Sequence, residues 1–322
     1  MLVAVAHKPL PGSTILMSKP TRVFLASLLL SPLGLAACVD DPGPGDGDDA
    51  ADMDVTDGSD VVDDTTDTGT DDSSVPLDSD QDGLTDEEEA MYGTDPLNKD
   101  TDGDRYWDSW EIIEGTDPLD KDDRIYYGYW PYNPNKADLD QGSWGGAKKN
   151  VGTPFPAGTF LDQYGDMVDP YDFTNFDQTE WGEPAYFIFD LSAQWCGPCH
   201  NVADWIAGVD NGNTSWIQDS YPTVREKVHT VRIWWTTFVV QDANGQLPTQ
   251  ADVQTWFNQH HDPLIPLFVD AEQKVLNAYG SDSFPHFFLM TPELKLGYFP
   301  QPGESTNANP YPALGLVDTQ LN

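Results

Sequence analysis

The chain has 322 residues, of which 55 are Asp or Glu and 15 are Lys or Arg, giving a formal net charge of −40. Nucleic acids and anionic membrane surfaces attract basic protein surface, so this composition excludes binding to either as the main function. Hydrophobic residues make up 39% and aromatic residues 12% of the chain, which is enough for a folded core. The charge is uneven: residues 39–124 contain 32 acidic and 4 basic residues, and all 11 Trp lie beyond residue 106.

The first 38 residues have the pattern of an export signal. Lys19 and Arg22 precede the apolar run 23–30, which is too short to span a membrane, and small residues lead to Cys38. The segment Leu35-Ala36-Ala37-Cys38 resembles the bacterial lipobox, which implies lipidation of Cys38 and anchoring to a bacterial membrane, on its periplasmic face or at the cell surface. The alternative is an ordinary signal peptide with an incidental Cys. Met17 would give a more usual start than Met1.

Residues 39–77 contain 14 Asp and no Lys or Arg. Such a segment has too little apolar surface to fold, and its like charges repel one another. We therefore expect a disordered acidic linker.

The acidic residues become periodic between residues 78 and 124. One stretch matches the calcium-loop pattern D-x-D-x-D-G-x5-E, in which Gly83 permits a sharp turn. Calcium takes six to eight oxygen ligands, and this spacing wraps them around one point. The predicted ligands are the carboxylates and, at position seven, a backbone carbonyl, from Asp78, Asp80, Asp82, Leu84, Asp86 and Glu89.

The pattern recurs 22 residues later, with Arg105 in place of the turn glycine. The predicted ligands of this second loop are Asp100, Asp102, Asp104, the Tyr106 carbonyl, Asp108 and Glu111. The same offset separates the two Gly-Thr-Asp-Pro segments 93–96 and 115–118. Together these features resemble thrombospondin type 3 repeats, which implies calcium as a structural cofactor that folds the loops. The alternative is unstructured acidic chain.

Cys196 and Cys199 form a close C-x-x-C pair in Trp195-Cys196-Gly197-Pro198-Cys199-His200. Such a pair can be a redox centre, half of a zinc site or, with the following His, a c-type haem attachment. The apolar run 186–191 before it predicts a buried strand, and Val202, Trp205 and Ile206 after it have helical spacing. A cysteine at the start of a helix is favoured as the thiolate, which points to redox chemistry.

These residues resemble the thioredoxin family, whose active-site motif is W-C-G-P-C. The buried strand also contains one acid, Asp190, six residues before the first cysteine, where the family has a buried aspartate. The resemblance implies that Cys196 attacks a disulfide and that Cys199 resolves the mixed disulfide. It also implies that Asp190 assists proton transfer from Cys199 and that Trp195 belongs to the site.

A proline after residue 280 extends the resemblance. Pro285 directly precedes the apolar strand 286–290, as the family's cis-proline does, which implies that it packs beside Cys196 and orients substrate peptide. The family usually has Thr at the next position, where this chain has His286. The opening of the domain near residues 151–165 resembles the redoxin group, including membrane-anchored thioredoxins of the TlpA kind. Ala193 stands where peroxiredoxins need Thr, which disfavours a peroxidase.

The periodicity predicts an α/β, thioredoxin-like fold, a central mixed sheet flanked by helices. The expected elements are strands 185–191, 230–238, 264–269, 286–290 and 294–299, and helices 199–208, 249–260 and 271–279. The expected segments are a signal peptide 1–38, a linker 39–77, calcium repeats 78–124 and a thioredoxin-like domain 125–322.

Three further groups of residues each allow two interpretations. His200 either tunes Cys196 or lies on an exposed first helical turn. The run His260-His261-Asp262 is either a metal cluster or a solvated helix end. Aromatic residues in the domain's N-terminal extension form either a ligand platform or packing; they are Tyr126, Tyr127, Tyr129, Trp130, Tyr132 and Trp144.

The function we expect is that of an extracytoplasmic thiol-disulfide oxidoreductase, acting as a protein-disulfide reductase without an organic cofactor. Its expected partners are disulfide-containing extracytoplasmic proteins, a membrane thiol reductase as electron donor, and the membrane through the lipid on Cys38. The alternatives are a calcium-dependent surface binding protein with a non-catalytic thioredoxin-like domain, and a c-type cytochrome. No nucleic-acid partner is expected.

Overall fold

The computed structural model describes residues 76–145, 149–174, 185–280, 283–306 and 309–321. The predicted signal peptide, the lipid site at Cys38 and nearly all of the predicted linker lie outside these residues. Within the described part of the chain, no helix is long and apolar enough to cross a membrane.

A five-stranded mixed sheet forms the centre of the domain, in the order β5-β4-β3-β6-β7. Strand β3 pairs in parallel with β4, and β4 with β5, whereas β6 pairs antiparallel with β3 and β7. The strands are β3 (Tyr186–Ala193), β4 (Ile233–Gln241), β5 (Leu267–Val269), β6 (His286–Met290) and β7 (Leu296–Tyr298). This arrangement is a thioredoxin-like sheet, and it confirms the fold class predicted from the sequence.

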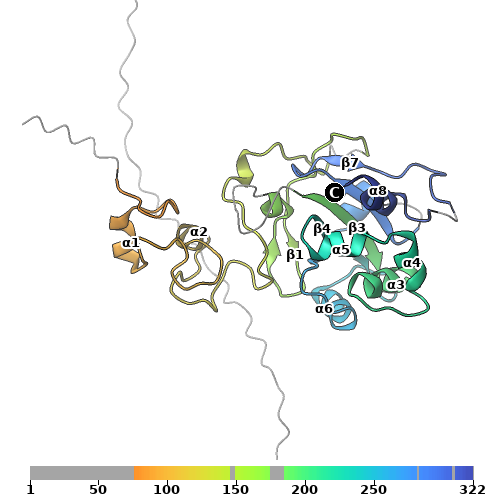
Figure 1. Cartoon of the computed structure of the whole chain (residues 1–322), viewed down its shortest axis with the longest axis horizontal. Coiled ribbons are helices and arrows are strands. Elements are labelled where there is room, and N and C mark those ends of the chain that lie inside the picture. Colours follow the sequence, from red (N-terminus) through yellow and green to blue (C-terminus); the bar gives the residue numbers. More distant parts are fainter. Residues whose placement is uncertain (1–75, 146–148, 175–184, 281–282, 307–308, 322) are drawn as a thin grey trace, which may run out of the picture. The chain divides into compact units, whose positions relative to one another are not determined.

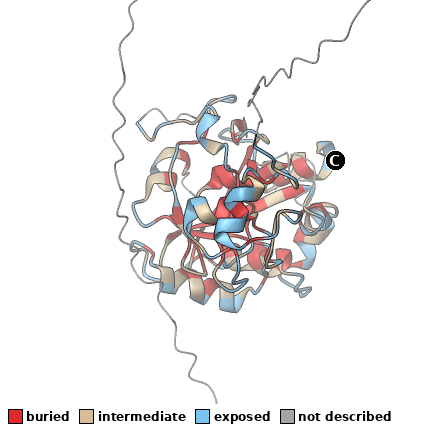
Figure 2. Ribbon diagram, turned by 90° about the vertical axis from the view of Figure 1, so that its left-hand side faces the viewer, coloured by how far each residue is buried: buried red, intermediate tan, exposed pale blue. Residues whose placement is uncertain are grey.

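Helices and an irregular extension cover the two faces of this sheet (Figure 1). One face packs against α3 (Gly197–Ile206), α4 (Ser215–Ser220), α5 (Val224–His229), α6 (Gln250–Gln259) and α8 (Pro312–Gln320). The other packs against α7 (Lys274–Tyr279) and segments between residues 125 and 173. Figure 2 shows buried residues concentrated between these layers, with exposed residues on the outer sides of the helices.

Side chains of β3 alternate between the two cores because successive residues of a strand point to opposite faces. Phe187, Phe189 and Leu191 belong to the core beneath the extension, whereas Ile188 belongs to the core that contains α3. Asp190 is in phase with Ile188, so its carboxylate points toward the layer that carries the cysteines.

The extension before β3 is held by a buried carboxylate. It contains the hairpin of β1 (Phe160–Leu161) and β2 (Met167–Val168) and the 3-10 turns η1 (Lys136–Asp138) and η2 (Pro170–Thr174). Asp172 accepts hydrogen bonds from the Tyr126 hydroxyl (2.6 Å) and the Lys136 ammonium (2.7 Å). Tyr126, Trp130 and Tyr132 are buried, so these members of the aromatic group pack the domain.

The acidic repeats contain two short helices, α1 (Asp86–Tyr92) and α2 (Asp108–Glu114), which we had not predicted. Each ends at the glycine of a Gly-Thr-Asp-Pro segment, with Gly93 at φ 89° and Gly115 at φ 76°, a conformation that favours glycine. Tyr106 and Trp110 of the second repeat are buried in the same core as Trp130. The Tyr106 hydroxyl donates to the Trp130 carbonyl at 2.7 Å. The second repeat therefore packs into the core of the following domain.

The other predicted elements are present with shifted ends. The strand expected from residue 230 begins at Ile233, because α5 ends at His229 and Val231 has a left-handed φ of 56°. The helix expected from residue 199 begins at Gly197, because Cys196 is its N-cap. The periodicity of the sequence does not predict α4, α5, α8 or the β1–β2 hairpin, since each is short and has little periodic signal.

Candidate functional site

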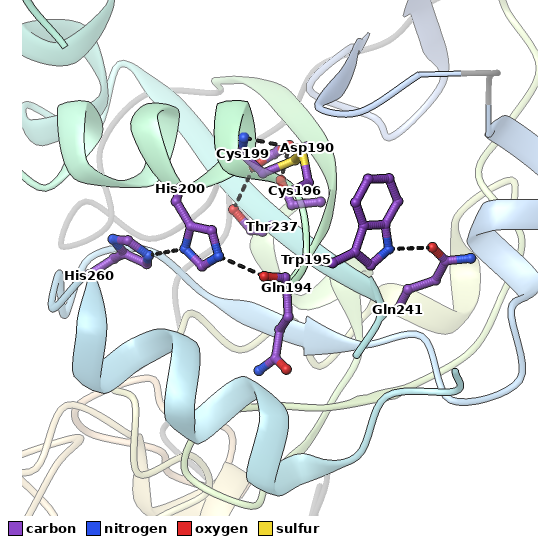
Figure 3. The surroundings of a disulfide bond; sticks show 10 residues. Asp190, Gln194, Trp195, Cys196, Cys199, His200, Thr237, Gln241 and His260 are labelled. Carbon is purple, nitrogen blue, oxygen red and sulfur yellow. Dashed lines mark hydrogen bonds between the residues drawn. A yellow bond between two sulfur atoms is a disulfide. The ribbon is translucent and has the colours of Figure 1, made fainter. Parts of the chain in front are cut away.

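The two cysteines lie at the start of α3 and form a disulfide, with their Cα atoms 5.3 Å apart (Figure 3). Cys196 is the N-cap of the helix, and the backbone N–H of Cys199 donates to its Sγ at 3.3 Å. Pro198, in the first turn, has no N–H to leave unpaired and stabilises this helix start. When the disulfide is reduced, the Cys196 sulfur would face free amides and the positive end of the helix dipole, which favour a thiolate.

Trp195 connects the cysteine motif to the segment before β6. It is 52% exposed, and its indole Nε1 donates to Gln241 Oε1 at 2.8 Å. Its ring lies edge-on to Phe284, with centroids 5.9 Å apart. The Phe284–Pro285 peptide bond is cis, as the resemblance implied. The two loops therefore meet at one edge of the sheet.

A cleft of about 880 Å³ has the cis-proline in its wall. Neither cysteine lines it. His286 lies in its wall, only 8% exposed, and burial together with Lys149 lowers the pKa of its imidazole to about 4. The ring is therefore neutral at physiological pH. The cleft is lined mostly by aromatic residues and prolines, including Phe284, Phe287, Phe299, Pro300, Tyr311 and Pro312.

Asp190 is a buried acid held by two hydroxyl groups. Ser192 Oγ donates to its Oδ1 at 2.8 Å and Thr237 Oγ1 donates to its Oδ2 at 3.1 Å. Burial raises the pKa of Asp190 to about 7, against the opposing effect of these two hydrogen bonds. A carboxyl group with such a pKa can release and accept a proton near neutral pH. The contact of Asp190 with Ser192 could be predicted from the sequence, because residues two apart in a strand lie on the same face. The contact with Thr237 depends on the β3–β4 register.

His200 is not on an exposed turn. Its ring contacts the Gln194 carbonyl at 2.7 Å and the His260 ring at 2.7 Å, and it stacks on Trp256 with centroids 4.7 Å apart. These contacts and the disulfide favour the redox interpretation of the motif over haem attachment.

The run His260-His261-Asp262 does not converge on one point. His260 turns toward Asp204, His261 packs on the Phe257 ring, and Asp262 contacts His229 at 2.9 Å. Among the described residues, the groups spaced to hold a metal are the two aspartate triplets of the acidic loops.

The first three acids of each loop gather around one point. The triplets Asp78, Asp80, Asp82 and Asp100, Asp102, Asp104 each place one carboxylate oxygen within 4.8 Å of the other two. Asp82, Glu89, Asp104 and Glu111 are buried. Crowding of this many carboxylates is unfavourable unless a cation balances their charge.

Several of these buried oxygens have no hydrogen-bond partner, which is the expected signature of a ligand set. They include one oxygen each of Asp80, Glu89, Asp102, Asp104 and Glu111. Without metal, burial and then the neighbouring aspartates raise the pKa of Glu89 to about 7 and that of Glu111 to about 9. The oxygen-only donor set fits calcium.

The repeated Gly-Thr segments position these glutamates. Thr94 Oγ1 donates to Glu89 Oε1 at 3.4 Å, and Thr116 Oγ1 donates to Glu111 Oε1 at 3.2 Å. One oxygen of each glutamate is thereby fixed, and the other is left without a partner.

The remaining predicted ligands are less directly placed. Asp86 accepts from the backbone N–H and the hydroxyl of Ser79, and Asp108 does the same with Thr101. Both acids therefore brace the second residue of their loop, and their contact with metal stays a prediction, as does that of the Leu84 and Tyr106 carbonyls. Arg105 adopts a left-handed φ of 87° at the turn where the first loop has Gly83.

Comparison with known families supports this interpretation of the acidic region. The family described as the bacterial TSP3 repeat matches residues 78–99 and 100–121. Residues 78–121 form two bacterial TSP3 repeats. No curated protein matches the chain.

Several solved structures resemble the chain at low identity. The thioredoxin domain of a thiol-disulfide oxidoreductase from Bacteroides vulgatus is 17% identical, with 54% of this chain and 99% of that chain covered and a TM-score of 0.35. A thiol:disulfide interchange protein from Bacteroides sp. gives 17% identity, coverage of 54% and 91%, and a TM-score of 0.35. A thioredoxin-like protein from Bacteroides caccae gives 11% identity, coverage of 47% and 46%, and a TM-score of 0.33. The thioredoxin-like fold of this chain follows from its own strand order.

Replacing Asp190 by Asn should stabilise the oxidised chain at alkaline pH. The folded carboxyl keeps its proton up to about pH 7, whereas the unfolded one loses it near its ordinary value of 3.8. Stability is therefore lost as pH rises between these values and stays lower above them. Denaturant unfolding at pH 8 should show Asp190→Asn more stable by on the order of 3 kcal/mol. Asp219→Asn, an exposed change in α4, should have no effect; equal unfolding curves for wild type and Asp190→Asn would contradict the expectation.

Removing the closing glutamate of the first loop should weaken calcium binding. Glu89→Gln keeps the shape of the side chain but removes the charge that would close the site, so calcium affinity should fall roughly tenfold. Calorimetric titration of the full chain measures this. Glu87→Gln, an exposed change in the same helix, is the matched control and should bind as wild type does. Identical titrations for all three chains would remove Glu89 from the site.

Proposed function

We propose that the protein is a thiol-disulfide oxidoreductase that reduces disulfides in other proteins. The observation that carries the proposal is a disulfide at the N-terminus of α3 beside a buried carboxyl with a pKa near neutral. This arrangement combines a stabilised thiolate with a proton acceptor, and both are needed for exchange near neutral pH.

In the reduced protein, the Cys196 thiolate attacks one sulfur of a substrate disulfide. A bond forms between Cys196 Sγ and that sulfur, and the other substrate sulfur leaves as a thiolate that takes up a proton. Cys199 then loses its proton to the Asp190 carboxylate and attacks Cys196 Sγ. The second substrate sulfur leaves, so the substrate gains two electrons and two protons while the 196–199 disulfide forms. A membrane thiol reductase would return these two electrons to the protein.

The cis-proline segment provides a place for the substrate chain. Pro285 stands at the start of β6, and its neighbour His286 pairs with Leu191 near the end of β3. Exposed Trp195 on one side and the aromatic cleft on the other would let an extended peptide lie across the disulfide. The Gly-Pro pair between the cysteines resembles that of reducing thioredoxins, which favours reduction as the direction.

We further propose that the domain works outside the cytoplasm on a lipid-anchored stalk. The lipobox-like segment at Cys38 and the acidic residues 39–77 support this location. Calcium, which is more abundant outside cells than in the cytoplasm, would be held by the triplet aspartates with Glu89 and Glu111. It would neutralise their charge and stiffen residues 78–121.

The chain should catalyse the reduction of insulin by dithiothreitol, and Cys196→Ser should abolish this activity. Cys199→Ser should instead trap a mixed disulfide between Cys196 and the substrate, because the resolving thiol is gone. Non-reducing gel electrophoresis detects this species. Undiminished reduction by Cys196→Ser would exclude the mechanism and favour a binding protein whose disulfide is structural.

Mass spectrometry of the mature protein from its native membrane should find an N-terminal, lipid-modified Cys38. Replacing Cys38 by Ser should release the protein from the membrane fraction, because the acyl chains are its anchor. A mature chain that still begins at Met17 would contradict the lipid anchor.

A further inference from the structure

A chain of three short hydrogen bonds runs from the Gln194 carbonyl through His200 and His260 to Asp204, and Figure 3 shows the first two. His200 Nε2 lies 2.7 Å from the Gln194 carbonyl oxygen, and His200 Nδ1 lies 2.7 Å from His260 Nε2. His260 Nδ1 lies 2.7 Å from Asp204 Oδ1. All four ring nitrogens of the two histidines are therefore in hydrogen-bond contact.

The partners of the two rings fix which nitrogen atoms carry a hydrogen. A backbone carbonyl only accepts, so His200 Nε2 must carry a hydrogen, and the carboxylate of Asp204 requires one on His260 Nδ1. Two neutral rings have just these two hydrogens. The facing nitrogens, His200 Nδ1 and His260 Nε2, would then both present lone pairs at 2.7 Å, which is repulsive. A third hydrogen between them turns this contact into a hydrogen bond.

We propose that His200 and His260 share one proton between their facing nitrogens, so that the pair is a single cation held beside the redox disulfide. Asp204 provides the balancing negative charge at 2.7 Å. The two histidines are positioning residues in this proposal: they act on the charge of Cys196 and do not touch the substrate.

The surroundings of the pair set how firmly the proton is held. Trp256 stacks on the His200 ring at 4.7 Å with an interplanar angle of 26°, a geometry in which an aromatic face stabilises a cation. Burial brings the pKa of the His260 imidazole below its ordinary value, and Asp204 opposes this shift. Among the described residues, Asp204 on α3 is the ionisable group outside the pair that hydrogen-bonds to it. The cation is thus opposed by burial and maintained by one carboxylate.

The position of the pair relates it to the chemistry, and this step rests on the proposed function. His200 lies four residues after Cys196, and its backbone N–H donates to the Cys196 carbonyl at 3.2 Å, so the two residues are one helical turn apart at the start of α3. The bond from His200 to the Gln194 carbonyl also fixes the backbone two residues before Cys196. A cation here lowers the pKa of the reduced Cys196 thiol and so raises the fraction of thiolate that can attack a substrate disulfide.

The shared proton is tested first on the unaltered chain. Only six histidines are present, so nitrogen-15 labelling of histidine gives a spectrum that single substitutions can assign. At pH 7 we expect His200 Nε2 and His260 Nδ1 to be protonated and one hydrogen to be shared by the facing nitrogens. Raising the pH should remove that hydrogen from both rings in one coupled step. Two facing nitrogens that are both unprotonated at pH 7 would overturn the proposal.

The effect on Cys196 is tested with His260→Gln, because Gln can still donate to His200 Nδ1 but carries no charge. We measure alkylation of the reduced full chain by iodoacetamide as a function of pH, in a Cys199→Ala background so that one thiol near the site reacts. Loss of this positive charge near the start of α3 should slow alkylation at pH 6 roughly tenfold. His261→Gln, the neighbouring exposed histidine outside the chain of bonds, should alkylate as the parent does.

These outcomes separate the proposal from the function on which it rests. If His260→Gln and His261→Gln alkylate at the same rate while insulin reduction still needs Cys196, the cation is wrong and the oxidoreductase stands. If insulin reduction does not need Cys196, the function fails, and the nitrogen-15 spectrum still decides whether the proton is shared. A His260→Gln chain with an altered circular dichroism spectrum is replaced by Asp204→Asn, which removes the counter-charge and should give the same slowing.

Discussion

The contact between the Cys196 sulfur and the first amides of α3 is the constraint around which the site is built. The helix α3 begins shortly after β3 ends, and the atom that caps it accepts a hydrogen bond from the first turn, where negative charge is favoured. The Cys199 amide points at that sulfur at 3.3 Å. The cis bond before Pro285 brings the segment ahead of β6 to the same edge of the sheet, where Phe284 meets Trp195. Capping and chemistry therefore require the same geometry.

Two ionisable centres lie around this contact, a buried acid in the sheet and a pair of histidines. Asp190 lies in the sheet, and hydroxyl groups alone hydrogen-bond to it. Ionising its buried carboxyl group is therefore costly in free energy. The His200–His260 pair lies on the opposite side of the motif and is balanced by Asp204. In the mechanism that we propose, Asp190 transfers the proton. The His200–His260 pair stabilises the negative charge of the Cys196 thiolate.

How much of this the sequence predicts depends on the range of the interaction. The cis-proline and the two aspartate triplets follow motifs of fixed spacing, so the sequence predicts them residue by residue. The strands of the sheet were predicted with shifted ends, since apolar runs do not show where a neighbouring turn such as that at Val231 begins. The hydroxyl of Thr237 and the ring of His260 reach the site from 47 and 60 residues away, respectively. Nothing local in the sequence indicates which residue of another element will face them.

Tyr106 belongs both to the second repeat and to the core of the domain that follows. Its carbonyl is a predicted ligand of the second loop, while its ring and hydroxyl lie in the core that Trp130 shares. A chain shortened to begin at residue 125 would lose Tyr106 and Trp110 and expose the apolar surface that they cover. The smallest independently folding unit therefore has to begin before the second loop. Calcium bound there would act on the domain's own melting transition, in addition to the rigidity of the stalk.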